Sequence, residues 1–168
     1  MEKALIVIEE MTRVGIIKSY AIGGGIAATY YIEPVLTYDL DVFFIPVKEG
    51  LDELAPIYEF ARNRGYSEEA EAILIEGFPV QFIPAYNDLV QEAVAEALVT
   101  RYHDVQVRIL RPEYLTAIAL QTGRAKDKER VVRLLESGTL DRDVLSRIVE
   151  KYGLTDRLRK LKDSEGNE

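Results

Sequence analysis

Two aspartates stand close together in an otherwise apolar stretch of this chain. Within residues 20–46, YAIGGGIAATYYIEPVLTYDLDVFFIP, Asp39 and Asp41 interrupt a run of β-branched and aromatic residues. Side chains alternate between the faces of a β-strand, so we expect both carboxylates on one face and the intervening apolar side chains on the other. Two neighbouring carboxylates repel each other unless a cation lies between them, and Mg²⁺ prefers oxygen ligands. The pair therefore predicts a magnesium site.

Three consecutive glycines precede the aspartates. Gly23, Gly24 and Gly25 lie between an expected strand and an expected helix. Backbone without Cβ can approach a phosphate closely, and the N–H groups that open a helix carry positive partial charge. Thirteen residues separate Gly25 from Asp39, which leaves room for a short helix and a return loop. We therefore expect the glycine turn to face the aspartates, with a phosphate and a cation between them.

A second Asp-x-Asp pair is expected to have a purely structural role. Asp141 and Asp143 follow Gly138 and open a helix, where acidic side chains cap exposed backbone N–H groups. Asp39 and Asp41 differ, because acidic residues within an apolar strand are disfavoured unless they have a partner. Metal or nucleotide binding is therefore our interpretation of the first pair only.

Composition limits the other chemistries. The 168 residues include no cysteine and a single histidine, which excludes disulfides, thiol nucleophiles and zinc sites built from thiolates or several histidines. A net charge of −8 argues against broad electrostatic binding of nucleic acid, although a local patch can still bind phosphates. No apolar run approaches the length of a membrane span. We therefore expect a soluble, cytoplasmic protein with no membrane partner.

Helices and strands are expected to alternate in the first two thirds of the chain, which predicts an α/β (α+β) fold with a mixed sheet and flanking helices. The predicted strands are residues 19–22, 38–45, 70–76, 79–83 and 105–110, and the predicted helices are residues 1–15, 26–32, 50–64 and 88–98. Gly77 and Phe78 join two of the strands and predict a hairpin. The apolar fraction of 48% is ample for a core.

From Pro112 onward the sequence changes to four helical segments separated by Gly123, Gly138 and Gly153. We therefore predict a core over residues 1–110, a C-terminal helical subdomain over residues 111–162 and a frayed tail over residues 163–168. The first two of these helices carry the densest group of basic residues before the tail, namely Arg124, Lys126, Lys128, Arg130 and Arg133. A charged helix face is usually only solvated.

In combination, these features resemble the DNA polymerase β-type nucleotidyltransferase superfamily. The features are the glycine turn, the small-residue helix after it, a Thr-x-Asp-hydrophobic-Asp strand starting at Thr37, and a Pro-Glu-x-Leu helix that runs into Arg-x-Lys-Asp at residues 124–127. Each motif is weak alone, and the combination covers roughly residues 18 to 136. Within the superfamily the chain is most similar to the small prokaryotic group that contains the AbiE-type toxin nucleotidyltransferases.

The resemblance implies transfer of a nucleoside monophosphate from a nucleoside triphosphate to a hydroxyl acceptor, with Mg²⁺ as cofactor and pyrophosphate as product. It further implies an RNA acceptor and an antitoxin or other partner protein. Carried over by position, the site residues comprise a catalytic set of Asp39, Asp41 and Lys126, of which the two aspartates hold metal, and a nucleotide-binding set of Gly23, Gly24, Gly25, Thr37, Gln81 and Lys126.

This chain departs from the superfamily pattern at four positions. Gln81 stands where a later strand usually carries a third carboxylate, and a neutral amide brings no charge and cannot act as a base. Val35 replaces an arginine, Gly25 replaces a serine of many members, and Arg130 replaces an acid.

Two alternatives to an active enzyme therefore stay open. One is a catalytically degenerate member that binds nucleotide or a partner protein. The other is a structural protein whose acidic strand binds a stabilising cation.

Overall fold

One seven-stranded mixed sheet forms the body of the computed structural model, which describes residues 1–33 and 37–165. The strand order is β3-β4-β5-β2-β1-β7-β6. In chain order the elements are α1 (Glu2–Arg13), β1 (Ile17–Ile22), α2 (Gly24–Tyr31), β2 (Leu40–Pro46), α3 (Ala55–Asn63), β3 (Ser67–Glu69), β4 (Ala72–Ile75), β5 (Phe78–Pro84), α4 (Asp88–Ala95), β6 (Leu98–Tyr102), β7 (Val105–Ile109), α5 (Pro112–Thr122), α6 (Ala125–Glu136), α7 (Arg142–Lys151) and α8 (Thr155–Glu165). The predicted α/β class with a mixed sheet and flanking helices is confirmed. No helix among these residues has the length and apolar character needed to cross a bilayer.

Strand β2 is central and has two different faces. It pairs antiparallel with β1 and parallel with β5. As predicted, Leu40, Val42 and Phe44 point to one face, where all three are fully buried. Asp41 alternates with them and lies beside Gln81 of β5 in the register of the parallel pair. The apolar face thus anchors the strand in the core while the opposite face presents polar groups.

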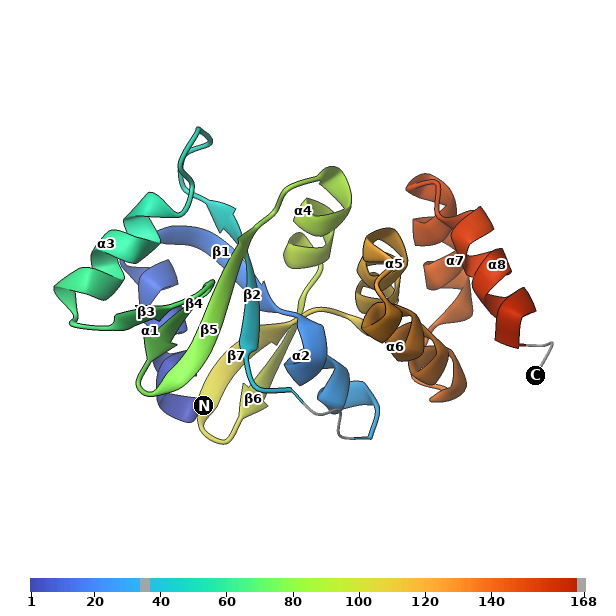
Figure 1. Cartoon of the computed structure of the whole chain (residues 1–168), viewed down its shortest axis with the longest axis horizontal. Coiled ribbons are helices and arrows are strands. Elements are labelled where there is room, and N and C mark those ends of the chain that lie inside the picture. The colour runs from blue at the N-terminus through green and yellow to red at the C-terminus, as the bar shows by residue number, and fades with distance from the viewer. Residues whose placement is uncertain (34–36, 166–168) are drawn as a thin grey trace.

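Helices α5 to α8 gather at one end of the molecule, and α2 and α4 lie between them and the far edge of the sheet (Figure 1). Helix α5 packs between the other C-terminal helices and the rest of the molecule, because every residue from Pro112 to Leu120 is buried. Such a helix packs on all sides. It therefore fixes the position of α6, which follows after a single turn at Gly123 with φ of +70°. The predicted separators Gly138 and Gly153 also adopt left-handed backbone, which ends the preceding helical segments.

Several predicted boundaries were wrong. The helix predicted over residues 50–64 begins only at Ala55, since Pro56 lies in its first turn and the Asp52 carboxylate accepts a hydrogen bond from the Ala55 N–H at 2.9 Å. The helix predicted to reach residue 98 ends at Ala95, and Leu98 begins strand β6 instead.

Two short edge strands were not predicted. Strand β3 is fully exposed and therefore lacks the apolar alternation that marks a strand. Strand β6 pairs with β7 through a turn in which His103 has φ of +51°. The predicted hairpin is confirmed, with Glu76 and Gly77 both at positive φ between β4 and β5. Helix α8 continues to Glu165, three residues into the predicted tail. Val35, named as a departure from the superfamily pattern, lies outside the described residues.

The Asp141 side chain caps helix α7, as the sequence predicts. Its Oδ1 accepts hydrogen bonds from the backbone N–H groups of Asp143 at 3.0 Å and Val144 at 3.1 Å. Asp143 lies in the first turn, where a negative charge is favoured by the helix dipole. The second Asp-x-Asp pair thus stabilises a helix N-terminus.

We expect Asp141→Ala to lower the free energy of unfolding by about 1 kcal/mol, because two backbone donors lose their acceptor. Asp143→Ala should cost less, roughly 0.5 kcal/mol, because it removes only a favourable charge. Urea denaturation of both variants measures the difference. Equal losses would contradict the capping assignment.

Candidate functional site

Two adjoining cavities share the acidic pair. We call the first the β5-side lobe, which has a volume of about 200 Å³ and includes Gln81 and Tyr86 in its lining. The second, the α2-side lobe, has a volume of about 220 Å³ and includes Gly25 and Thr37. Four side chains line both lobes, namely Asp39, Asp41, Lys126 and Arg130. Both aspartates therefore point to the same side of the sheet, with open space around them.

The glycine turn lies directly against Asp41. The Gly23 N–H donates a hydrogen bond to the Asp41 backbone carbonyl at 2.9 Å. Gly24 has φ of +59°, and a Cβ placed on it would come within 1.8 Å of Asp41 Oδ2. Only glycine fits this position, because any side chain would overlap the carboxylate and strain the backbone. The N-terminus of α2 and the carboxylate of Asp41 thus form one continuous surface.

The other two glycines are also closely packed. A Cβ on Gly25 would lie 2.7 Å from Thr37 Cβ, so Thr37 fills the space that a serine at this position would need. A Cβ on Gly23 would lie 2.4 Å from the Phe43 ring. Gly23 is outside the lining of both lobes, and its predicted nucleotide contact stays a prediction.

Burial and the neighbouring charge of Asp39 both act on the Asp41 carboxylate. Desolvation, and secondly the charge of Asp39, raise the pKa of Asp41 from 3.8 to about 6, against the opposing effect of Arg130, Lys126 and Arg124. A carboxylate whose ionised form is disfavoured in this way gains most from a cation nearby. The Thr37 hydroxyl lies 3.5 Å from Asp39 Oδ1, which places the predicted threonine beside the pair.

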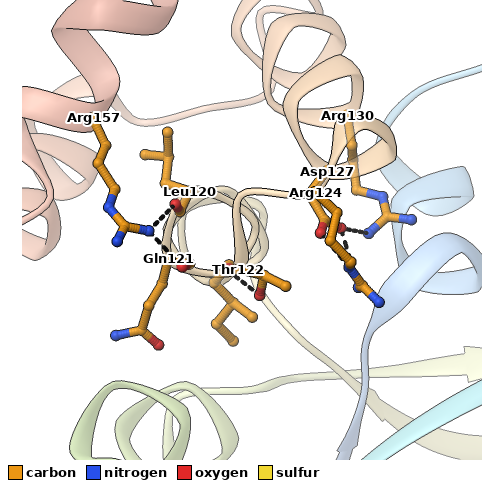
Figure 2. Close-up of polar contacts among 8 residues, drawn as sticks. Leu120, Gln121, Thr122, Arg124, Asp127, Arg130 and Arg157 are labelled. Atoms are coloured by element: carbon orange, nitrogen blue, oxygen red, sulfur yellow. Dashed lines mark hydrogen bonds and ion pairs between the residues drawn. The ribbon is translucent and has the colours of Figure 1, made fainter.

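A buried carboxylate on α6 orders the cations that face the acidic pair. Asp127 is 1% exposed. It accepts a hydrogen bond from Arg124 Nε at 2.7 Å and one from an Arg130 nitrogen at 3.5 Å (Figure 2). Lys126, between them in sequence, is exposed and lines both lobes. The sequence analysis included Arg124 and Asp127 in the Arg-x-Lys-Asp motif and named Arg130 as a departure from the superfamily pattern, but it assigned no role to Asp127 and did not predict its burial.

The end of α5 is held from its other side. Arg157 of α8 donates to the backbone carbonyls of Leu120 at 3.1 Å and Gln121 at 2.6 Å (Figure 2). These carbonyls belong to the last turn of α5, where a cation is favourable. The turn into α6 is therefore fixed between Arg157 on one side and the Asp127 cluster on the other.

Gln81 lines the β5-side lobe, but its side-chain amide also contacts Glu71, which is outside that lining. Its amide nitrogen donates to Glu71 Oε2 at 3.2 Å. Within residues 1–33 and 37–165, no three acidic or histidine side chains gather as a metal cluster. Two adjacent carboxylates still suit Mg²⁺, which is commonly held by one or two protein carboxylates together with substrate phosphates and water.

Known solved structures share this architecture. The chain matches the solution structure of the antibiotic-resistance factor ANT(2'')-Ia with a TM-score of 0.51 and 18% identity, over 99% of this chain and 98% of that chain. It matches the crystal structure of ANT(2'')-Ia in complex with adenylyl-2''-tobramycin with a TM-score of 0.54 and 17% identity, over 94% and 95% of the two chains. An antigenic nucleotidyltransferase-like protein from Paracoccidioides brasiliensis matches with a TM-score of 0.53 and 13% identity, over 95% and 93%. The chain has a nucleotidyltransferase fold. No family model and no curated protein matches the sequence.

Within this nucleotidyltransferase fold, the structure brings together most of the residues that the sequence predicts. Gly24, Gly25, Thr37, Asp39, Asp41, Gln81 and Lys126 line one or both lobes. Tyr86 is an addition, and burial raises the pKa of its hydroxyl. Lys128 belongs to the predicted basic cluster but lines a separate cavity beside α8.

We expect Gly24→Ala to disrupt the site, because the added methyl overlaps Asp41 Oδ2 and the positive φ is strained. The loss of unfolding free energy should exceed about 1 kcal/mol. Gly50→Ala is the matched control, since a Cβ there meets nothing within 4 Å. Thermal denaturation of both variants measures the effect, and unchanged stability of Gly24→Ala would contradict the close packing.

The raised pKa of Asp41 predicts a pH-dependent effect of Asp41→Asn. The folded protein holds this proton more tightly than the unfolded chain, so ionisation of Asp41 costs stability as pH rises from 3.8 through about 6. Without metal, the variant should therefore melt at a higher temperature than wild type near pH 8. Near pH 4 the two should differ little, because Asp41 is then largely protonated.

Calorimetric melting curves across this range test the sign. Asp104→Asn, which alters an exposed loop aspartate, should shift neither end of the profile. A destabilised Asp41→Asn variant near pH 8 would contradict the assigned desolvation.

Proposed function

We propose that this chain is a Mg²⁺-dependent nucleotidyltransferase that transfers a nucleoside monophosphate from a nucleoside triphosphate to a hydroxyl acceptor. The observation that carries the proposal is the acidic pair at the shared boundary of two lobes, with the N-terminus of α2 on one side and the cations of α6 facing it. The nucleotidyltransferase fold supports it, although the fold alone does not decide the activity.

The α2-side lobe suits the triphosphate. Gly25 brings the first turn of α2 into its lining, and Lys126, Arg130 and Arg133 supply positive charge. Helix N-termini and basic side chains together bind phosphate oxygens. When bound at Asp39 and Asp41, Mg²⁺ would neutralise phosphate charge and help to orient the triphosphate.

The β5-side lobe suits the acceptor. In-line displacement requires the attacking hydroxyl to approach the α-phosphate from the side opposite the leaving pyrophosphate. With the terminal phosphates in the α2-side lobe, that side is the β5-side lobe. Its wall includes Leu115 and Ile118 of α5, and Gln81 and Tyr86 offer hydrogen bonds.

Few groups in the described lining of the β5-side lobe can take the proton that the attacking hydroxyl loses. The carboxylates of the β5-side lobe are Asp39, Asp41 and Asp127, and Asp127 is already bound by Arg124 and Arg130. Gln81 cannot accept a proton as a base. Proton acceptance from the hydroxyl therefore falls to the acidic pair or to solvent.

The class of acceptor is proposed from the resemblance of the sequence to known proteins and from the matched structures, and the lining of the β5-side lobe does not enter this argument. Similarity to AbiE-type toxin nucleotidyltransferases favours an RNA acceptor, an antitoxin partner and a cytoplasmic setting. The matched ANT(2'')-Ia structure instead contains an adenylylated small molecule, adenylyl-2''-tobramycin. A small hydroxyl compound is therefore the second acceptor class to test.

One observation favours a catalytically degenerate nucleotide-binding module as the alternative. Gln81 replaces the third carboxylate of the superfamily pattern, and its amide is bonded to Glu71. A protein of this kind would bind a nucleoside triphosphate in the same lobes without transferring its nucleotidyl group.

We expect Asp39→Ala and Asp41→Ala to abolish Mg²⁺-dependent ATP binding while the fold is retained, because each removes a carboxylate of the only Asp-x-Asp pair lining a lobe in the described structure. Isothermal titration calorimetry with ATP and Mg²⁺ measures the loss. Asp143→Ala, from the pair that opens α7, is the matched control and should bind as wild type does. Unchanged ATP affinity in both site variants would refute the assignment.

Incubation with labelled triphosphates and Mg²⁺ distinguishes an active nucleotidyltransferase from a degenerate nucleotide-binding module. Label transferred to RNA, or to a small hydroxyl compound such as tobramycin, supports transfer and identifies the acceptor class. Saturable ATP binding without transfer to any acceptor supports the degenerate alternative. Absence of binding of all four nucleoside triphosphates by the wild-type protein refutes both.

A further inference from the structure

Arg130 lies where the two lobes meet and is incompletely partnered. It is one of four side chains that line both lobes, and its side chain is 13% exposed. Its Nε is buried and has no hydrogen-bond partner among the described residues. Its contact with Asp127 is a single one at 3.5 Å, the outer limit of a hydrogen bond. A guanidinium has five N–H donors, so most of its bonding capacity is unused.

Asp127 contacts Arg124 more closely than it contacts Arg130. Arg124 contacts both oxygens of the Asp127 carboxylate, with the shorter distance 2.7 Å. One carboxylate is thus divided between two guanidinium groups, which leaves one positive charge uncompensated within this cluster. A mostly buried cation in this state is costly, because desolvation is only partly offset. Arginine does not escape this cost by losing its proton.

The charges of the α2-side lobe indicate which ligand would satisfy Arg130. The acidic and basic side chains of its lining, leaving aside the phenol of Tyr38, are Asp39, Asp41, Glu129, Lys126, Arg130 and Arg133. Acids and bases are equal in number, so the lobe is neutral when all six are charged. A divalent cation bound by the acidic pair would make the lobe positive, which matches a polyphosphate.

We propose that Arg130 binds the β- and γ-phosphates of the nucleoside triphosphate from its position at the boundary of the lobes. This inference rests on the proposed function and assigns a role to a residue that departs from the superfamily pattern. It makes Arg130 the residue that distinguishes a triphosphate from a monophosphate.

The role is compatible with the balance of the transfer step. A bond forms between the acceptor oxygen and the α-phosphorus, and the bond from the α-phosphorus to the bridging oxygen of the β-phosphate breaks. The electron pair of that bond leaves with pyrophosphate, and the acceptor proton passes to the acidic pair or to solvent. Arg130 keeps its own protons and donates hydrogen bonds to the departing oxygens.

The test compares Arg130→Gln with wild type for binding of Mg²⁺–pyrophosphate, Mg²⁺–ATP and AMP by calorimetry. Affinity for pyrophosphate and ATP should fall by about tenfold or more, since a charge-assisted hydrogen bond is lost. Affinity for AMP should change less than about twofold by the same reasoning. Lys128→Gln is the matched control, because Lys128 lies on the same helix but lines a different cavity, and all three affinities should be retained.

A purely structural role for Arg130 predicts a different pattern. Arg130→Gln leaves the buried Asp127 carboxylate paired with Arg124, so the thermal stability should stay close to that of wild type. If Arg130→Gln loses pyrophosphate affinity only together with thermal stability, the proposed phosphate contact is wrong. If stability is retained and pyrophosphate affinity falls, the contact is supported.

The outcomes separate this inference from the proposed function. Wild-type binding of ATP with no selective loss in Arg130→Gln overturns the role of Arg130 and leaves the proposed function standing. Selective loss of pyrophosphate affinity in a protein that transfers no label supports Arg130 and overturns the transfer. Failure of the wild-type protein to bind either ATP or pyrophosphate overturns both.

Discussion

The desolvated charge of Asp41 is the constraint on which the site depends. Strand β2 needs its apolar face in the core, and that requirement fixes Asp41 on the opposite face at the centre of the sheet. Burial and Asp39 both disfavour ionisation there. The cost is tolerable only because the surroundings supply positive potential, from the N-terminus of α2 on one side and from α6 on the other.

Close packing around Asp41 explains why the surrounding backbone has so little freedom. Gly24 has no room for a Cβ because the carboxylate occupies that space, and Gly25 has none because Thr37 does. The turn, the carboxylate and the threonine are therefore mutually fixed, and Gly25 in the first turn of α2 lines the α2-side lobe together with both acids. Positioning of this kind is what nucleotidyl transfer requires from a protein.

The sequence predicted the parts of the structure that depend on local pattern. Alternation around Asp39 and Asp41 predicted the strand and its faces, and the position of Asp141 after a glycine predicted a helix cap. Strand β3 was missed because its exposed Ser-Glu-Glu has no apolar period, and β6 because its neighbours continue a helical pattern. The Asp127 cluster could not be predicted, since a carboxylate in the first turn of a helix is ordinarily exposed and only the tertiary packing of α6 buries it.

The two departures at Gln81 and Arg130 change the charge of the site in the same direction. Relative to the superfamily pattern, Gln81 removes a negative charge and Arg130 replaces a negative charge with a positive one. Fewer carboxylates leave fewer ligands for a second divalent cation. A guanidinium at the boundary of the lobes supplies positive charge that needs no metal to hold it there. Under the proposed function, the loss at position 81 and the gain at position 130 therefore compensate each other, because the fixed arginine neutralises phosphate charge that a second metal ion would otherwise have to neutralise.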